Sequence, residues 1–277
     1  MTGKNKFAMA FHCYQPVFNL EEEFDKAYEK AYLPLLNVFE DTPEIKATFH
    51  FPGNMLEWFK SKHPDYLAKI KRLLSRGQIE LIGGGCFEPI MTLIPEVDRR
   101  GQISMNNSII EDLFGVKPKG SWLTERVWDP ELVDTLISLE VKYTIIDDHH
   151  LFRAGIKAED IFCPYRTKGA KGRLTLFPIF KQLRYAMPFN APKEVIRHMK
   201  DRTDDKAGPK NFFFADDGEK FGRWPHTYKL VYTKGWLRKF FLLLKENSAW
   251  LETVTYSDLL DSAETKDVGE VPMSSYS

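Results

Sequence analysis

Acidic side chains follow several short apolar segments of this sequence, at the points where the segments turn polar. Glu125 follows one segment, Asp147 and Asp148 follow the next, and Asp216 and Asp217 follow a third. Carboxylates rarely occupy apolar surroundings without a partner, because burying an unpaired charge is costly. Several of them at comparable positions therefore indicate a functional site. The other polar side chains at such segment ends are His12, Tyr14, Gln15, Glu88, Glu219 and Tyr256.

Glu125 and Asp217 have the side-chain chemistry that glycoside cleavage requires. Two carboxyl groups flank the bond, and a separation of about 5 Å lets one of them attack the sugar directly, whereas a wider gap admits water. Trp122 and Trp128 lie on either side of Glu125 and offer flat apolar faces for a pyranose ring. The pair therefore predicts a carbohydrate-active site.

A purely structural interpretation of the same carboxylates also stays open. Arg126 directly follows Glu125, and Lys220 lies three positions after Asp217. Each cation could simply neutralise its acidic neighbour.

Such a site needs a scaffold that brings the segment ends together. Short apolar runs alternate with amphipathic stretches, which indicates parallel strands joined by crossover helices. About seven strands are more than a compact open sheet needs, and they favour an α/β barrel with its chemistry at the carboxyl ends of the strands. The predicted strands are Lys6–Phe11, Lys46–Phe51, Ile79–Ile82, Gly120–Arg126, Lys142–Ile146, Asn211–Phe214 and Leu251–Tyr256.

The segments between the strands read mainly as helices. Phe24–Phe39 has helical spacing with an expected break or kink at Pro34, and Met55–Leu74 is interrupted near His63 and Pro64. An irregular, partly β insertion is expected around residues 152–189.

The composition restricts the partners. Lys plus Arg and Asp plus Glu both number 39 among the 277 residues, so the formal net charge is zero. A neutral chain gives no reason to expect nucleic acid or an anionic membrane as its main partner. The three cysteines show no metal or disulfide spacing, and no apolar run could cross a bilayer or act as a signal peptide. We therefore expect a cytoplasmic protein.

Four segments in order along the chain resemble the motifs of glycoside hydrolase family 57. Residues 122–128 (Trp-Leu-Thr-Glu-Arg-Val-Trp) are similar to the nucleophile motif, and residues 216–225 (Asp-Asp-Gly-Glu-Lys-Phe-Gly-Arg-Trp-Pro) to the acid/base motif. Residues 83–90 resemble the Gly-rich substrate-binding segment, and residues 12–16 the N-terminal His-x-His-Gln-Pro motif. The similarity is greatest to the 4-α-glucanotransferase and α-amylase branch.

This resemblance implies a distorted (β/α)7 TIM-like barrel and a retaining double displacement on α-1,4-glucans or maltooligosaccharides, without a metal or other cofactor. It implies Glu125 as the nucleophile and Asp217 as the general acid/base. For Asp216 a structural role is favoured over one in orienting its neighbour. Whether water or a second sugar accepts the glycosyl group stays open. The substrate-binding residues that we expect from it are His12, Tyr14, Gln15, Glu88, Trp122, Trp128, Asp148 and Trp224.

The sequence departs from the family pattern in three places. Tyr14 replaces the second histidine of the N-terminal motif. Unlike imidazole, a phenol cannot take up and release a proton at neutral pH. Cys86 replaces the usual residue before the aromatic-Glu-Pro run. We expect residues 1–262 to form the catalytic barrel, and residues 263–277 to form a tail leading to a helical bundle and a β-rich domain that this chain lacks.

Two alternatives to an active glucan enzyme follow. The substitution at Tyr14 and the short C-terminal region are compatible with a truncated or non-catalytic glucan-binding homologue. A metal-dependent polysaccharide deacetylase is less favoured, because its metal needs histidines that are commonly spaced His-x-x-x-His. No two of the seven histidines are four positions apart, and His149 and His150 are adjacent.

Overall fold

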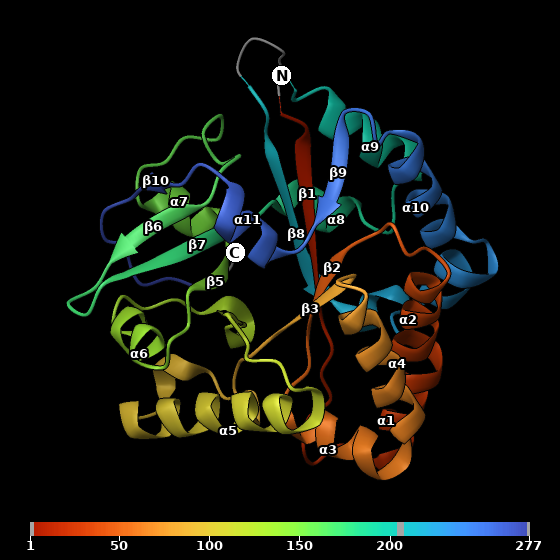
Figure 1. The fold of residues 1–277 in the computed structure, drawn as a ribbon, viewed down its shortest axis with the longest axis horizontal. Helices are drawn as coiled ribbons and strands as arrows, with labels where there is room; N and C mark the ends of the chain where they lie inside the picture. Colours follow the sequence, from red (N-terminus) through yellow and green to blue (C-terminus); the bar gives the residue numbers. More distant parts are fainter. Residues whose placement is uncertain (1–2, 204–207, 276–277) are drawn as a thin grey trace.

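Parallel strands form the centre of the molecule, and helices cover their outer side (Figure 1). The computed structural model describes residues 3–203 and 208–275. Within these residues, the parallel strands of the barrel are β1 (Asn5–His12), β2 (Ala47–His50), β3 (Ile79–Ile82), β4 (Gly120–Ser121), β5 (Tyr143–Asp147), β7 (Arg173–Ile179) and β8 (Asn211–Asp217).

Two irregular joints connect the strands into a distorted barrel. The first sheet has the order β3-β2-β1-β8, and the second contains β4, β5 and β7 in that order. A single parallel bridge between Gly83 and Ser121 joins β3 to β4. The backbone N–H of Phe180 donates to the carbonyl of Phe213 at 3.0 Å and joins the end of β7 to β8. The predicted α/β barrel of seven strands is confirmed.

The membership of the barrel differs from the prediction at two strands. β7 lies within the segment expected to be an irregular insertion, and it pairs in parallel with β5 along five residues. The predicted last strand, β9 (Leu251–Val254), instead pairs with Asn5–Ala8 of β1, whereas β2 pairs with Ala10–His12. β9 and β2 thus share one edge of β1, so β9 is an accessory strand.

The remaining strands flank the second sheet. β6 (Tyr165–Lys168) pairs antiparallel with β7, and β10 (Lys266–Asp267) pairs with β6. The predicted strand Gly120–Arg126 ends already at Ser121, and a 3-10 turn follows at Thr124–Arg126.

The helices agree with the predicted pattern except at Pro34. The helical run does not stop there but changes type, because the π turn Tyr28–Tyr32 ends directly before α2 (Leu33–Glu40), and Pro34 lies in the first turn of α2, where a missing N–H is tolerated. The interruption at His63 is confirmed, since one helix ends and the next begins there. The helices are α1 (Glu21–Ala27), a π turn (Tyr28–Tyr32), α2 (Leu33–Glu40), α3 (Gly53–Lys62), α4 (Pro64–Ser75), α5 (Glu96–Phe114), α6 (Leu132–Ser138), α7 (Asp148–Arg153), α8 (Lys181–Ala186), α9 (Pro192–Lys200), α10 (Trp236–Glu246) and α11 (Tyr256–Ser262).

Aromatic side chains pack around the first sheet. β1 is buried along both faces, as expected for a central parallel strand. The Phe11 ring contacts those of Phe49 and Phe214 at centroid distances of 5.4 and 5.9 Å. A second apolar cluster lies beside β5 and β7, and it includes Trp128 and Val271.

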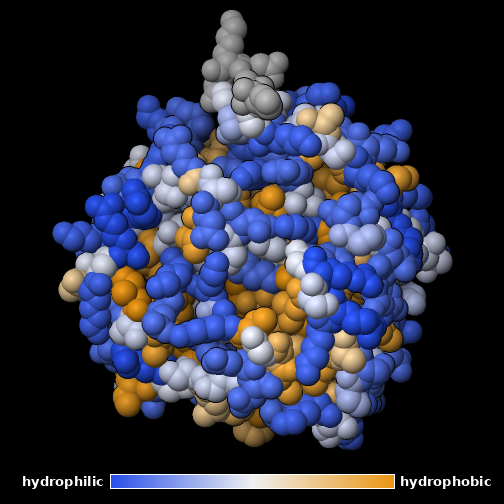
Figure 2. Space-filling model, in the orientation of Figure 1, coloured by the Kyte–Doolittle hydropathy of each residue, from blue (hydrophilic) through white to orange (hydrophobic). Residues whose placement is uncertain are grey.

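The segment after residue 262 packs on this second cluster. Val271 is buried, and Ser274 forms an antiparallel bridge with Trp128. The outer surface in Figure 2 is mostly hydrophilic, with apolar side chains visible between the polar ones. Among the described residues, no helix is long and apolar enough to cross a membrane.

Candidate active site

The carboxyl ends of the barrel strands bring the predicted chemistry together at one end, which we call the rim. His12 is the last residue of β1, and it is in register with His50 of β2 on one side and with Asp217 of β8 on the other. Asp147 ends β5. Loops after β3 and β4 supply Glu88 and Glu125. This arrangement is the one in which α/β barrels build active sites.

Glu125 lies on a turn with an unusual backbone. Its φ and ψ angles are 52° and 14°, and the next residue, Arg126, has a φ of 51°. Left-handed backbone is uncommon for residues other than glycine, and it costs on the order of 1 kcal/mol or more per residue. The turn leaves the Glu125 side chain exposed while that of Arg126 is buried.

Arg126 anchors this turn to the barrel. Its Nε donates to Asp147 Oδ2 at 3.1 Å, in a pair in which both side chains are almost fully buried. The guanidinium also lies 5.9 Å from the centre of the Trp122 ring. The strain of the Glu125 turn is thereby offset by a buried ion pair and a cation–π contact.

The two aspartates at the end of β8 have different surroundings. Asp216 is buried and accepts from Lys220 Nζ at 2.6 Å and from Arg184 Nε at 3.1 Å. Lys220 thus pairs with Asp216, where the structural interpretation had paired it with Asp217. Asp216 therefore ties β8 to neighbouring cations, as its expected structural role requires.

Asp217 keeps its proton to a higher pH than an ordinary aspartate does. Its pKa is raised to about 6 by burial and by the charge of Asp216, with a smaller contribution from the charge of Glu125, while Arg126 and Arg184 oppose the shift. Charges influence one another in this way only at short range. Glu125 and Asp217 therefore lie within electrostatic reach of each other across the rim.

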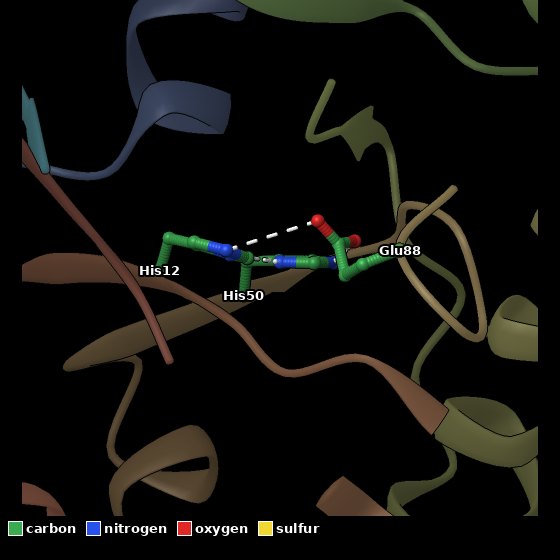
Figure 3. A group of neighbouring side chains, drawn as sticks. All are labelled: His12, His50 and Glu88. Atoms are coloured by element: carbon green, nitrogen blue, oxygen red, sulfur yellow. Dashed lines mark hydrogen bonds and ion pairs between the residues drawn. The ribbon is translucent and has the colours of Figure 1, made fainter. Parts of the chain in front are cut away.

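His12, His50 and Glu88 form a buried cluster beside this pair (Figure 3). His12 Nδ1 lies 2.8 Å from His50 Nδ1, and the Nε2 atoms of both rings lie 3.7 Å from Glu88 carboxylate oxygens. Glu88 Oε2 accepts from Thr124 Oγ1 at 3.0 Å. Burial raises the pKa of Glu88 to about 8, so its carboxyl group carries a proton at neutral pH.

Trp122 supports this cluster from one side. Its ring is nearly parallel to that of His12, with the centroids 4.8 Å apart, and it is buried. On the other side of His12, the Tyr14 ring lies 5.9 Å away at an interplanar angle of 22°. Tyr14 is half-buried. Tyr14 thus lies on the more exposed side of the His12 ring, and Trp122 lies on the buried side.

Glu219 is a rim residue whose contacts the sequence did not reveal. It accepts a hydrogen bond from the backbone N–H of Tyr14 at 2.8 Å and another from the Tyr32 hydroxyl. Burial raises its pKa to about 8. Gln15 donates to the Tyr32 hydroxyl at 3.2 Å, so this predicted substrate-binding residue contributes to the same internal network. In the sequence, the only indication that Glu219 belongs to the rim is its position in the acidic run after β8.

The structure separates three other predicted substrate-binding residues from this cluster. Trp128 is completely buried, and its indole N–H donates to the carbonyl of Val271, so its ring presents no open face. Asp148 begins α7, accepts from the backbone N–H of Lys181 at 3.1 Å, and lines a separate, largely apolar cavity of about 640 Å³. Trp224 is 40% exposed and lies beside Phe189, as a sugar platform requires.

The ligand types in the His12, His50 and Glu88 cluster suit a divalent cation, but the contact between the rings does not. Neutral imidazoles that bind a cation through Nε2 keep their protons on Nδ1. Two such protons would face each other across the 2.8 Å contact between the Nδ1 atoms. Joint ligation through both Nε2 atoms is therefore opposed by this arrangement.

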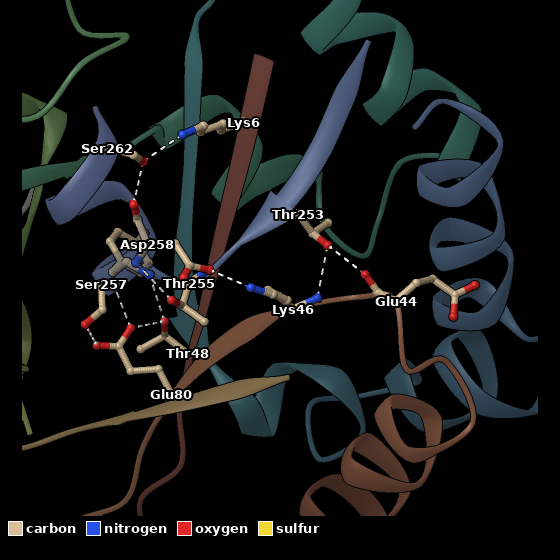
Figure 4. A network of polar contacts seen from close by, with 11 residues as sticks. Lys6, Glu44, Lys46, Thr48, Glu80, Thr253, Thr255, Ser257, Asp258 and Ser262 are labelled. Carbon is tan, nitrogen blue, oxygen red and sulfur yellow. Dashed lines mark hydrogen bonds and ion pairs between the residues drawn. The ribbon is translucent and has the colours of Figure 1, made fainter. Parts of the chain in front are cut away.

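A second buried polar cluster lies at the other end of the strands, away from the rim (Figure 4). Glu80 accepts from Thr48 Oγ1 at 3.0 Å, from the Tyr143 hydroxyl at 2.6 Å, and from the backbone N–H and hydroxyl of Ser257. Lys46 pairs with Asp258 at 3.0 Å. These contacts fasten α11 to β2, β3 and β5, so Glu80 is a structural carboxylate.

Comparison with known proteins identifies the family. The sequence model of glycosyl hydrolase family 57 matches residues 5–274, nearly the whole chain. The chain belongs to glycosyl hydrolase family 57. Its membership confirms the resemblance of the four motifs and, together with the histidine geometry, disfavours the metal-dependent deacetylase.

Relatives within family 57 carry two kinds of name. The chain is 40% identical over 270 residues to a 4-alpha-glucanotransferase of Thermococcus litoralis, which covers 98% of this chain and 40% of that protein. It is also 40% identical over 277 residues to alpha-amylase 1 of Dictyoglomus thermophilum, covering 100% and 40% of the two chains. The chain thus spans about two fifths of the length of these curated relatives.

A solved structure shows the same fold. The crystal structure of the 4-alpha-glucanotransferase from Thermococcus litoralis superposes with a TM-score of 0.93 at 40% identity, covering 99% of this chain and 42% of that one. The distorted (β/α)7 barrel is therefore the barrel of this family.

Proposed function

We propose that residues 1–262 are the catalytic barrel of a retaining enzyme acting on α-1,4-glucans, with Glu125 as nucleophile and Asp217 as general acid/base. The observation that carries this proposal is the contrast between the two carboxyl groups at one rim. Glu125 is exposed on a rigidly anchored turn, and Asp217 has a pKa raised to about 6, partly by the charge of Glu125. An acid must hold its proton, and the raised pKa of Asp217 favours this compared with an ordinary aspartate, whereas the exposed carboxyl group of Glu125 is open to attack a sugar.

In the first step, a carboxylate oxygen of Glu125 attacks the anomeric carbon while the glycosidic bond breaks. Asp217 donates its proton to the departing oxygen, which leaves as a free sugar hydroxyl, and a glycosyl ester on Glu125 remains. The Glu125 carboxylate stabilises the positive charge that develops on the sugar before the ester forms. Asp217, having given up its proton, is ready to act as a base.

In the second step, Asp217 accepts a proton from the incoming hydroxyl, and that oxygen displaces Glu125 from the anomeric carbon. Two inversions at the same carbon give net retention. Water as the acceptor gives hydrolysis, and the hydroxyl of a second glucan gives transfer. The names of the relatives include both outcomes, so we propose an α-amylase or 4-α-glucanotransferase type of activity.

The experiment is to incubate the purified chain with maltotriose to maltoheptaose and to separate the products by chromatography. Products longer than the starting sugar establish transfer, and only shorter products establish hydrolysis. Glu125→Gln is expected to reduce turnover by several orders of magnitude while it leaves sugar binding intact. No turnover by the folded wild-type chain, combined with sugar binding, would favour the non-catalytic homologue.

A further inference from the structure

Two exposed aromatic side chains lie near the end of β8, where the proposed acid/base is located. The side chains of Phe189 and Trp224 are 51% and 40% exposed, and their ring centroids lie 6.5 Å apart at an interplanar angle of 31°. Trp224 follows β8, and Phe189 lies in the segment between α8 and α9. Neighbouring aromatic rings that remain exposed beside an active site are a candidate surface for a ligand with an apolar face.

One buried cation contacts both rings and the end of β8. The Nζ atom of Lys220 lies 5.4 Å from the centre of the Phe189 ring and 5.6 Å from that of Trp224. The same atom donates to Asp216 Oδ2 at 2.6 Å, and the next residue is Asp217. Because an ammonium group within about 6 Å attracts an aromatic ring, Lys220 holds both rings close to the acid/base. Lys220 is only 2% exposed, so the exposed surface of the rings lies away from it.

Hydrogen bonds also fix the backbone that carries each ring. The backbone N–H of Trp224 donates to the carbonyl of Glu219 at 3.2 Å. Next to Phe189, the carbonyl of Asn190 accepts from the indole N–H of Trp236 at 2.6 Å. The two rings are therefore in place before a ligand arrives, which lowers the entropy cost of binding.

The position of Asp217 decides which sugar unit these rings meet. An acid must lie within hydrogen-bond reach of the oxygen that it protonates, and in the proposed reaction that oxygen belongs to the departing sugar. The departing sugar therefore lies on the Asp217 side of the cleaved bond, next to the rings. An incoming acceptor takes the same place, because the second step retraces the first.

We propose that Phe189 and Trp224 form a platform for the acceptor sugar, and that Phe189 sets the balance between transfer and hydrolysis. This inference rests on the proposed function, since it needs the glycosyl ester on Glu125. The acceptor hydroxyl gives its proton to Asp217, its oxygen bonds to the anomeric carbon, and the ester bond to Glu125 breaks. Water has no apolar face to stack on the rings, so the platform favours the sugar over water.

The test measures how the glycosyl ester is divided between water and an added sugar. α-Maltosyl fluoride is the donor, because its departing fluoride leaves no sugar on the platform, and maltose is the acceptor. Released fluoride counts the esters formed and maltotetraose counts the transfers, so the ratio of transfer to hydrolysis does not depend on how fast the ester forms. At a fixed low maltose concentration, Phe189→Ala is expected to lower this ratio about tenfold, the size of one lost ring contact. Leu242→Ala, which removes an exposed apolar side chain from the outer helix α10, is the control and should leave the ratio unchanged.

Sugar binding by the free protein gives a second readout, which needs no turnover. The indole ¹H–¹⁵N signal of Trp224, identified by its loss in Trp224→Phe, is expected to shift as maltose is added. Phe189→Ala should need about tenfold more maltose for the same shift.

The outcomes separate the platform from the proposed function. An unchanged ratio of transfer to hydrolysis in Phe189→Ala, or hydrolysis without any transfer by the wild type at high maltose, would overturn the platform. A wild-type protein that releases no fluoride but shows the expected shifts would refute only the proposed function. No fluoride release together with an unmoved Trp224 signal would overturn both.

Discussion

The backbone N–H of Asp217 donates a hydrogen bond to the side chain of its neighbour Asp216 at 3.0 Å. The buried Asp216 also pairs with Lys220 and Arg184, whereas Asp217 ends the strand at the rim. Two adjacent residues of the same type thereby acquire different tasks, because only one of them is neutralised by cations.

Asp216→Asn is expected to move the alkaline limb of the pH profile to lower pH. The charge of Asp216 raises the pKa of Asp217, so its removal lowers that pKa, and the charge of the nearby Arg184 acts in the same direction. The limb of kcat/KM should shift by about one pH unit. Asp41→Asn, which breaks only an exposed pair with Arg238, is the control. An unshifted limb would show that Asp217 does not titrate in that range.

Asp217→Asn is expected to stabilise the protein at neutral pH while it impairs catalysis. The pKa of Asp217 is raised in the folded state, so the carboxyl group loses its proton more readily when the chain unfolds. Wild-type stability therefore falls as pH rises from about 4 to about 6, by about 1–3 kcal/mol. Urea unfolding at pH 4 and at pH 8 should show a gain for the variant only at pH 8.

The same variant tests the role of Asp217 as an acid. Substrates with good leaving groups need little protonation, so Asp217→Asn should lose less rate on them than on natural glucans. Equal losses on both substrates would contradict the assignment.

Glu219→Ala is expected to be less stable than Glu219→Gln by about 2 kcal/mol. The amide of Gln can still accept from the Tyr14 backbone N–H and the Tyr32 hydroxyl, whereas Ala leaves both donors without their acceptor. Neither variant titrates at this position, so the comparison is free of the raised pKa of Glu219. Thermal unfolding of the two variants measures this difference in stability. Equal melting temperatures would mean that these hydrogen bonds contribute little.

Glu80→Leu is expected to destabilise the barrel without any direct effect on the rim. The donors on Thr48, Tyr143 and Ser257 all lose a buried acceptor, which should cost about 3 kcal/mol or more. Glu57→Gln, which breaks only an exposed pair with Lys60, should leave the melting temperature unchanged. If Glu80→Leu unfolds at the wild-type temperature, the network does not hold α11.

Strand ends could be predicted from the sequence because burial on both faces gives parallel strands long apolar runs. His12 and Asp147 end their strands one residue beyond the predicted ends, and Asp217 ends its strand three residues beyond. β7 lies in the segment that was expected to be an irregular insertion, where the antiparallel β6 precedes it. Membership of the barrel depends on pairing between strands that are distant in sequence, and the local sequence pattern carries no information on that pairing.

The contacts within the site were harder to predict. His50 lies one residue before the end of a predicted strand, but it was considered only for metal spacing along the chain. Its partner His12 lies 38 positions away on a neighbouring strand. Trp128 was expected at the sugar, yet it is buried under Val271, from a segment expected to lead away from the barrel. Arg126 pairs with Asp147, although Glu125 is its neighbour in sequence. In each case the partner comes from a segment that is distant in sequence and is brought close by the fold.

β1 is paired along one edge with β8 and along part of the other with β9. Asn5 and Lys210, which are hydrogen-bonded, are 205 positions apart, so on the ribosome β1 emerges long before either strand exists. Until then the nascent chain exposes an apolar strand edge of the kind that pairs with other chains. We expect its yield in cells to depend on chaperones that cover this edge during translation, and slow steps in folding to coincide with the arrival of β8.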